Sequence, residues 1–177
     1  MVRRFLFTAF IALPIFFAHS ALAAQAAAED VKSRPNKQEI TDLMVQNRLP
    51  GPQQNSKIDQ ILADQIGSKT PRSDFMFCTG LAYLGNAKAQ ACVAKAYEIG
   101  LGVVEDLSEA YTWYALACET RTADASEAQK AEETRDRLRL RLLSVYPHPT
   151  EEELDDQVNA QKTRIAQYQS EIKKIKK

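Results

Sequence analysis

The stretch of sequence that decides the fold runs from Gly85 to Cys118 and reads GNAKAQACVAKAYEIGLGVVEDLSEAYTWYALAC. Its first half has apolar residues three or four positions apart, which lie on one face of a helix: Ala89, Val93, Ala94 and Tyr97. Its second half repeats this spacing with Ala110, Trp113, Tyr114 and Ala117. The stretch therefore predicts two helices that pack together, with alanines allowing close approach and aromatic rings filling the space beside them.

Two glycines and a capping box mark the turn between these predicted helices. Gly100 follows the last turn of the first helix, where glycine can adopt the left-handed conformation that satisfies orphan carbonyl groups. Gly102 then allows the chain to reverse. Asp106 and Glu109 have the spacing of a capping box, in which the aspartate accepts from the first turn and the glutamate reaches back. We therefore expect one helical hairpin over residues 85–118.

These residues resemble the Sel-one-like repeat, a relative of the tetratricopeptide repeat. The matching residues stand in register without a gap: Ala89, Tyr97, Gly100, Gly102, Val103, Asp106, Ala110, Trp113, Tyr114 and Ala117. Val93, Ala94 and Cys118 depart from the pattern, which has leucine, glycine and alanine there, and all three are small changes of volume. The resemblance covers about a fifth of the chain and implies a short solenoid of antiparallel helical hairpins.

The flanking sequence predicts more helices and no strand, because no alternating apolar run is long enough for a strand. Three further capping boxes begin at Asn36, Asp124 and Thr150 and predict helix starts near residues 37, 125 and 151. Two more helices are expected before the hairpin, one over about 56–66 and one that opens at Thr70-Pro71. The fold class expected is all-α.

We interpret the predicted helices on either side of the hairpin as degraded repeats. In the helix that opens at residue 71, Phe77 takes the place that Trp113 has in the intact repeat, so the helix over 56–66 is its worn first helix. The segment 125–143 begins like another repeat but becomes charged, and Glu133 with Arg137, or Glu132 with Arg135, could pair along it. One intact unit between two degraded ones satisfies the need of such arrays for about three units.

The C-terminal segment, residues 147–177, has a different pattern. Apolar and large residues alternate steps of four and three: Leu154, Val158, Gln161, Ile165, Tyr168, Ile172 and Ile175. Such spacing is typical of a coiled-coil seam and predicts a homo-oligomer or a partner helix. An amphipathic helix folded back on its own domain is the alternative. The lysines at the end of the chain fit a helix C-terminus, or a membrane or cell-wall contact.

The first residues have the form of a bacterial secretory signal peptide. Arg3 and Arg4 precede an apolar run over 5–18, and Ala21-Leu22-Ala23 is a small-x-small cleavage signal. A single membrane anchor is the alternative, but the run has only about 14 residues, against about 20 for a span. We expect cleavage after Ala23 and a periplasmic or secreted protein without a stable membrane span.

The expected organisation therefore has four parts. A signal peptide (1–23) is followed by an N-terminal extension with one helix (24–55), the repeat domain (56–146) and the C-terminal helix (147–177). The full chain balances 23 basic against 23 acidic side chains, and cleavage removes two of the basic ones. The mature protein is weakly acidic, so its charge predicts no nucleic-acid partner.

The chain has three cysteines, which export would place in an oxidising compartment. Cysteine-rich relatives of the family join adjacent helices by a disulfide across the Gly-Asn turn, which is Gly85-Asn86 here. The resemblance makes Cys78 and Cys92 the first candidate pair, and these two lie at similar heights on the helices beside that turn.

The pairing stays open at this point for two reasons. The family's own positions for the disulfide correspond to Ala82 and Gln90, and Cys92 lies off the apolar stripe of its helix. Cys92 with Cys118, or three free thiols, are the alternatives.

Candidates for catalysis are few. Cleavage leaves one histidine, His148, between two prolines, and no spacing supports a Cys118–His148 nucleophile pair. The sequence has no CxxC pair and no glycine-rich phosphate loop, and its scattered cysteines match no familiar zinc site. We therefore expect no enzyme, no cofactor and no metal site.

Protein or peptide recognition is the function that the resemblance implies. The first helix of each hairpin in such repeats lines a concave surface, and here the stripe beside its packing face contains Lys88, Ala91, Lys95 and Glu98. A solvated face is the alternative interpretation of this stripe. We expect an adaptor that binds a protein or peptide in the bacterial envelope; the alternatives are a structural oligomer held by the C-terminal coiled coil and a cell-wall enzyme or its regulator.

Overall fold

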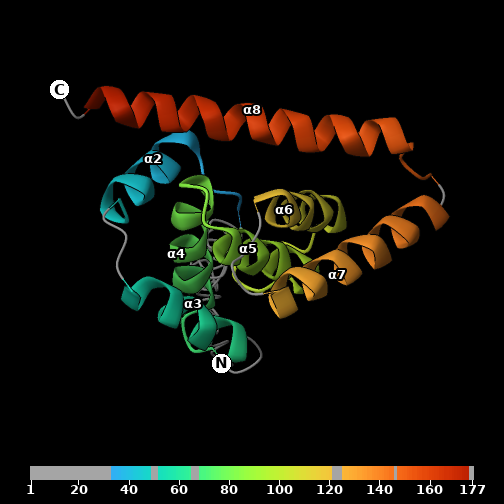
Figure 1. The fold of residues 1–177 in the computed structure, drawn as a ribbon, viewed down its shortest axis with the longest axis horizontal. Coiled ribbons are helices and arrows are strands. Elements are labelled where there is room, and N and C mark those ends of the chain that lie inside the picture. The colour runs from blue at the N-terminus through green and yellow to red at the C-terminus, as the bar shows by residue number, and fades with distance from the viewer. Residues whose placement is uncertain (1–32, 49–51, 65–67, 121–124, 146, 176–177) are drawn as a thin grey trace, which may run out of the picture. The chain divides into compact units, whose positions relative to one another are not determined.

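The computed structural model describes residues 33–48, 52–64, 68–120, 125–145 and 147–175. Within these ranges the protein is all helical, with seven helices and no strand (Figure 1). The helices are α2 (Lys37–Gln46), α3 (Pro52–Asp64), α4 (Pro71–Tyr83), α5 (Ala87–Ile99), α6 (Leu107–Thr120), α7 (Ala125–Ser144) and α8 (Glu151–Ile175). The expected all-α class is confirmed. The expected signal peptide and its cleavage site lie outside the described residues.

Side-chain caps explain where several helices begin. Asn36 and Glu39 form a complete capping box at α2, and Thr150 and Glu153 exchange the same pair of hydrogen bonds at α8. At α6 the Asp106 carboxylate accepts from the Glu109 backbone N–H at 3.0 Å. The predicted starts near residues 37, 125 and 151 are confirmed. Asp124, the proposed cap of α7, lies outside the described residues.

The α5–α6 hairpin forms where the sequence predicts it. Gly100 ends α5 with φ +69° and Gly102 follows with φ +74°, both in the left-handed region. The predicted apolar stripes of both helices are buried, and Val93, Ala94 and Ala110 are each 1 % exposed or less. Aromatic rings fill the space beside the alanines, as in the perpendicular contact of Phe75 with Tyr97 at 5.5 Å between ring centroids.

One difference from the expected helices concerns the start of α3. The helix α3 begins at Pro52, not near residue 56, so the expected boundary between extension and repeat domain falls inside a helix. Proline favours the first helical position because its missing N–H would have no partner there. Pro52 therefore opens α3, ahead of the start near residue 56 that the sequence predicts. Ile58 and Ile61 of α3 are buried.

A disulfide between Cys78 and Cys92 joins α4 to α5, with 6.1 Å between the two Cα atoms. Both cysteines are almost fully buried, at 0 % and 2 % exposed. Cys118 is a half-buried free thiol. At Ala82 and Gln90, the positions that the resemblance suggests for such a bond, the Gln90 side-chain amide donates to the Ala82 carbonyl oxygen at 3.4 Å. The covalent link and this hydrogen bond therefore connect the same two helices.

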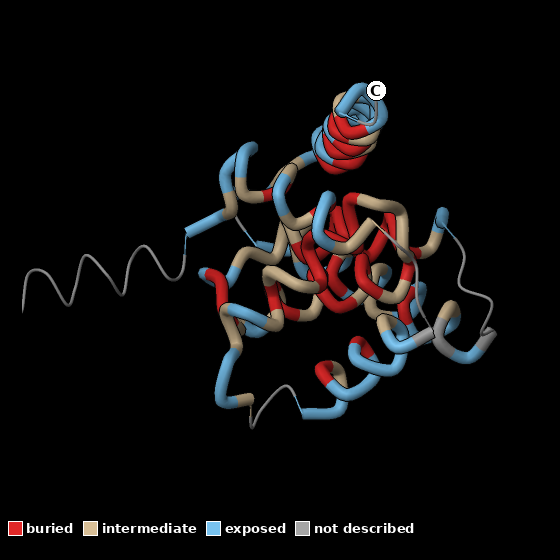
Figure 2. Tube along the Cα trace, turned by 90° about the vertical axis from the view of Figure 1, so that its left-hand side faces the viewer, coloured by how far each residue is buried: buried red, intermediate tan, exposed pale blue. Residues whose placement is uncertain are grey.

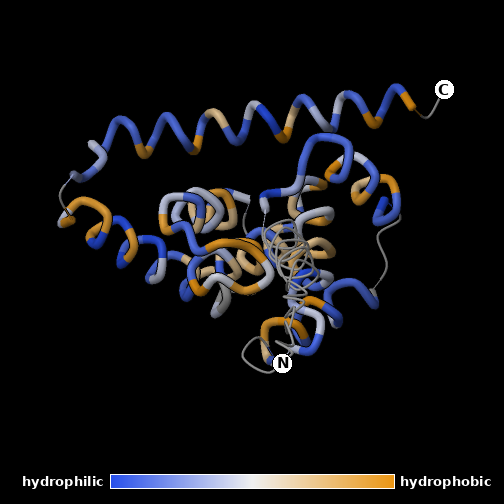
Figure 3. The backbone as a smooth tube through the Cα atoms, turned by 180° about the vertical axis from the view of Figure 1, so that it is seen from behind, coloured by the Kyte–Doolittle hydropathy of each residue, from blue (hydrophilic) through white to orange (hydrophobic). Residues whose placement is uncertain are grey.

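The C-terminal helix α8 lies along the side of the domain that α2, α4 and α6 form (Figure 1). Its predicted heptad residues from Leu154 to Ile172 are all buried there, whereas Ile175 is 61 % exposed. Figure 2 shows the buried residues of α8 facing the other helices, and Figure 3 shows hydrophobic residues spaced along that same side. Of the two arrangements that the spacing allows, the structure has the amphipathic helix folded back on its own domain.

The remaining helices pack on the hairpin from the other side. The helix α3 contacts α5, and α7 contacts α6. The face that α8 leaves uncovered is therefore built from α3, α5 and α7, and this face holds the candidate site.

Among the described residues, no helix is both long and apolar enough to cross a membrane.

Candidate functional site

A groove of about 610 Å³ lies between α3, α5 and α7, and α6 contributes part of its wall. Small and apolar side chains line most of it: Leu62, Ala63, Ala91, Ala117, Ala128 and Ala131. Three lysines and one aspartate supply the charge: Lys88, Lys95, Lys130 and Asp59. The groove is therefore apolar along its lining and mainly basic in its charged side chains.

The structure brings three of the four predicted partner-binding residues to this groove. Lys88, Ala91 and Lys95 all line it, because their spacing of three and four places them on one face of α5. The Lys88 ammonium lies 3.0 Å from the Asp59 carboxylate on α3. This pair connects α3 and α5, two of the helices that form the walls of the groove.

The fourth predicted residue, Glu98, has a structural position instead. Its side chain is 8 % exposed, and its Oε1 accepts from Arg137 of α7 at 2.6 Å. Its Oε2 accepts from Lys95 at 3.1 Å and from the Tyr114 hydroxyl at 3.2 Å. A carboxylate with these partners holds α5, α6 and α7 together. It has little exposed surface left for a partner protein.

The partners of Glu98 set its protonation. Burial disfavours the charged carboxylate, but hydrogen bonds from Arg137 and Lys95, together with their positive charges, outweigh it, so the pKa of Glu98 falls below its ordinary value. The sequence allowed Glu133 with Arg137, or Glu132 with Arg135, to pair along α7. In the structure Arg137 pairs with Glu98 and Arg135 pairs with Asp136. Arg137 reaches across to α5, where it forms a charge-assisted hydrogen bond with the largely enclosed Glu98 carboxylate.

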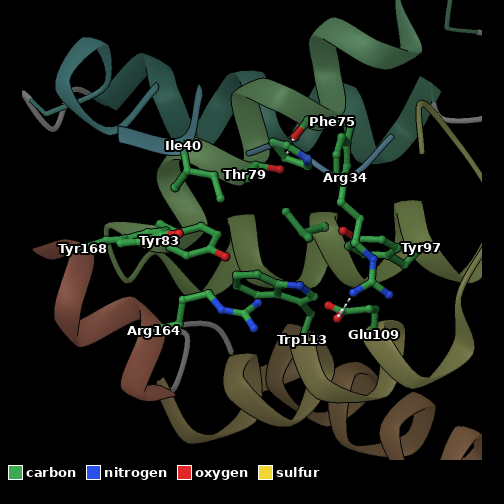
Figure 4. A pocket seen from close by; sticks show the side chains of 12 residues that line it. Arg34, Ile40, Phe75, Thr79, Tyr83, Tyr97, Glu109, Trp113, Arg164 and Tyr168 are labelled. Atoms are coloured by element: carbon green, nitrogen blue, oxygen red, sulfur yellow. Dashed lines mark hydrogen bonds and ion pairs between the residues drawn. The ribbon is translucent and has the colours of Figure 1, made fainter. Parts of the chain in front are cut away.

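A smaller cavity of about 240 Å³ lies elsewhere, under α8 and α2, and shares no lining residue with the groove. Five aromatic side chains line it: Phe75, Tyr83, Tyr97, Trp113 and Tyr168. Tyr83 is central, because its ring contacts Trp113 of α6 at 5.4 Å and stacks on Tyr168 of α8 at 5.3 Å. Figure 4 shows Trp113 between two arginines, Arg164 on one side and Arg34 on the other.

The N-terminal segment before α2 closes one end of this cavity. Arg34 binds Asp106 at 2.6 Å and Glu109 at 2.7 Å, and Arg72 donates to the Ser33 carbonyl oxygen at 2.7 Å. At the other end, the Gln161 side chain accepts from Arg164 at 2.8 Å and donates to the Tyr83 hydroxyl at 3.0 Å.

Sequence reasoning missed this cavity. It took Tyr97 and Trp113 as core residues, which they are, and it singled out neither Arg34 nor Arg164. Arg164 follows Gln161 at the edge of the buried stripe of α8, a position that a helical wheel would have shown. The stripe faces the aromatic rings of α4 and α6 because of the way α8 docks on the domain. A local sequence pattern does not predict this docking.

The residues considered for catalysis lie apart from both sites. His148 is exposed in the connection between α7 and α8. Cys118 is half-buried at the end of α6, where burial raises the pKa of its thiol. No group of three or more His, Cys, Asp or Glu side chains in the described ranges is arranged to hold a metal ion.

Comparison of the chain with protein-family models, with curated proteins and with solved structures found no match.

Proposed function

We propose that this protein is an exported adaptor of the bacterial envelope, built on Sel-one-like helical hairpins in a short solenoid. Its groove between α3, α5 and α7 binds a peptide segment of another protein. The observation that carries the proposal is the groove itself, whose lining combines small apolar side chains with three lysines and a single aspartate. The signal-like sequence before residue 24 supports export.

The groove's chemistry favours an acidic partner with some apolar side chains. Lys88 and Lys95 each already contact a carboxylate, Asp59 and Glu98. Lys130 is exposed and forms no ion pair with the described residues, so its charge is open to a partner. Apolar side chains of a peptide would cover the alanines of the groove, and burial of such surface contributes about 25 cal/mol per Å² before the costs of binding.

The position of α8 argues against the alternative of a structural oligomer. A coiled coil would need the heptad residues that lie against α2, α4 and α6. Exposing them would also uncover the surfaces of α2, α4 and α6 that α8 packs against. The adaptor function needs no such rearrangement, because the groove is open while α8 is docked.

A photo-crosslinking experiment tests the proposal in the envelope. Benzoylphenylalanine is placed at Ala91, which lines the groove, and in a matched strain at Ala166, which is exposed on α8. We expect the Ala91 probe to capture a defined protein and mass spectrometry to locate the crosslink in an acidic segment. Equal capture from both positions would contradict the groove assignment.

A purified system then measures the same contact. The crosslinked segment is synthesised with a fluorophore and titrated with the protein and with two variants, Lys130→Glu in the groove and Lys173→Glu at the exposed end of α8. Lys130 and Lys173 are both exposed, so neither change disturbs the core. We expect weaker binding for Lys130→Glu alone; unchanged binding by both variants would refute the proposal.

A further inference from the structure

The cavity under α8 is a second candidate binding site, separate from the groove. Its lining comes from the N-terminal segment and from α2, α4, α5, α6 and α8. At about 240 Å³ it exceeds the cavity of about 150 Å³ that holds a benzene molecule in a protein core. Its size therefore suits one ring with a small polar substituent, and its aromatic walls suit a flat ligand.

The acidic groups beside this cavity are already neutralised. Arg34 lies 2.6 Å from the Asp106 carboxylate and 2.7 Å from the Glu109 carboxylate. A cationic ligand would have to compete with a guanidinium group that two charge-assisted hydrogen bonds hold in place. The cavity therefore offers a ligand few free acceptors.

Hydrogen-bond donors, by contrast, remain without partners. Trp113 is 2 % exposed and Tyr97 is 5 % exposed, and among the described residues neither the indole N–H nor the Tyr97 hydroxyl forms a hydrogen bond. Neither atom is sealed away, because the side-chain polar atoms that are both enclosed and unpartnered in the described ranges belong to Arg48 and Gln90. Both donors are therefore accessible and unpartnered, so an acceptor on a ligand can bind either of them.

Two further donors lie at the edge of the cavity under α8. The Tyr83 hydroxyl accepts from Gln161, so its own proton is free to be donated. The Arg164 guanidinium donates to Gln161 and has no carboxylate partner among the described residues. Burial raises the pKa of both Tyr83 and Tyr97, so both hydroxyls keep their protons at neutral pH and remain donors.

We propose that this cavity binds a small planar carboxylate. Its ring lies among the aromatic walls, and its carboxylate accepts from Arg164 and from the Tyr83 hydroxyl at the same end of the cavity. A carboxylate fits because it is acceptor-only and flat, and because Arg164 supplies the unneutralised positive charge at the cavity edge. The site is independent of the peptide groove, so either assignment can fail without the other.

Tryptophan fluorescence tests the proposal directly, because Trp113 is the only tryptophan in the chain. The full mature protein is titrated with benzoate and with two probes of similar size and different charge, benzyl alcohol and benzylamine. We expect a saturable change in Trp113 emission with benzoate, and a much weaker response with the neutral and cationic probes.

Three conservative variants assign the binding to named atoms. Arg164→Gln should weaken benzoate binding about tenfold or more, since it removes a charged hydrogen bond, and Tyr83→Phe should weaken it several-fold, since it removes the neighbouring hydroxyl donor. Arg141→Gln, an exposed change on α7 outside the cavity, should leave it unchanged. Unfolding curves for each variant separate lost binding from lost folding.

Four results would overturn the proposal. Benzylamine binding as tightly as benzoate would show that the cavity selects cations. No saturable response to any probe would show a packing void. Equal affinity in Arg164→Gln would remove the carboxylate contact. Tighter binding of a peptide that ends in phenylalanine than of benzoate would assign the cavity to a partner's C-terminus.

Discussion

Arg137 on α7 and Glu98 on α5 form an ion pair of 2.6 Å across the two helices. Glu98 is 8 % exposed, whereas the Arg137 side chain is 59 % exposed. The pair links α7 to α5, the first helix of the hairpin. We expect Arg137→Ala to lower the free energy of unfolding by about 1 kcal/mol, and Arg141→Ala, an exposed change on the same helix, by less than about 0.5 kcal/mol.

The same pair predicts a pH dependence. The pKa of Glu98 lies below its ordinary value of 4.5 in the folded protein, so its contribution is fully present above that pH and is lost as acid protonates the carboxylate. Urea unfolding of the wild type and of Arg137→Ala should therefore differ by a constant amount near neutral pH. The difference should shrink below pH 4.5, and a gap that persists in strong acid would contradict the assignment.

The disulfide predicts a thiol count and a stability change. Under oxidising conditions, denatured protein should show one reactive thiol, Cys118, and reductant should expose all three. Replacing Cys78 and Cys92 together by alanine should lower the free energy of unfolding by about 3 kcal/mol, the amount expected for a loop of this length. Three reactive thiols without reductant would contradict the bond.

The two left-handed glycines of the hairpin turn should respond differently to alanine. A Cβ at Gly102 would overlap the Pro71 carbonyl oxygen, whereas at Gly100 the nearest atoms lie at an ordinary 3.5 Å. We expect Gly100→Ala to cost about 1–2 kcal/mol, from backbone strain alone. Gly102→Ala should cost more than about 3 kcal/mol, because strain and overlap add. Equal thermal melting temperatures would show that the turn relaxes.

The docking of α8 predicts a position-dependent effect along one helix. Ile165 is 8 % exposed against the domain, and its neighbour Ala166 is exposed. We expect Ile165→Asp to destabilise the protein by about 3 kcal/mol or more, because it buries an unpaired charge, and Ala166→Asp by less than about 0.5 kcal/mol. A change of oligomeric state in Ile165→Asp, with the stability of the domain intact, would favour a coiled coil instead.

Features set by neighbours in the sequence were predictable. The capping boxes at Asn36 and Thr150 and the turn glycines at 100 and 102 follow local rules that tertiary packing has no reason to change. The α8 stripe was predictable as a set of residues, although its spacing suited a partner helix as well as the protein's own core. Only the position of α2, α4 and α6 decides between those two.

The residues of the candidate sites differ in the same way, because some positions follow from local spacing and others depend on tertiary packing. Lys88, Ala91 and Lys95 share a helix face, so their common position at the groove followed from spacing. The ion pair that encloses Glu98 did not follow from spacing, because its partner Arg137 lies on α7, beyond the α5–α6 hairpin. The aromatic cavity is harder still, since Arg34 and Arg164 come from opposite ends of the described chain.

Tyr83 stacks on Tyr168 and meets the ring of Trp113, so three helices share one run of aromatic contacts. Because Trp113 is the chain's single indole, this run is a built-in optical reporter of the C-terminal helix. Detachment of α8 would alter emission before the hairpin itself opens. Local release of one helix could thus be timed separately from global unfolding, in unlabelled protein.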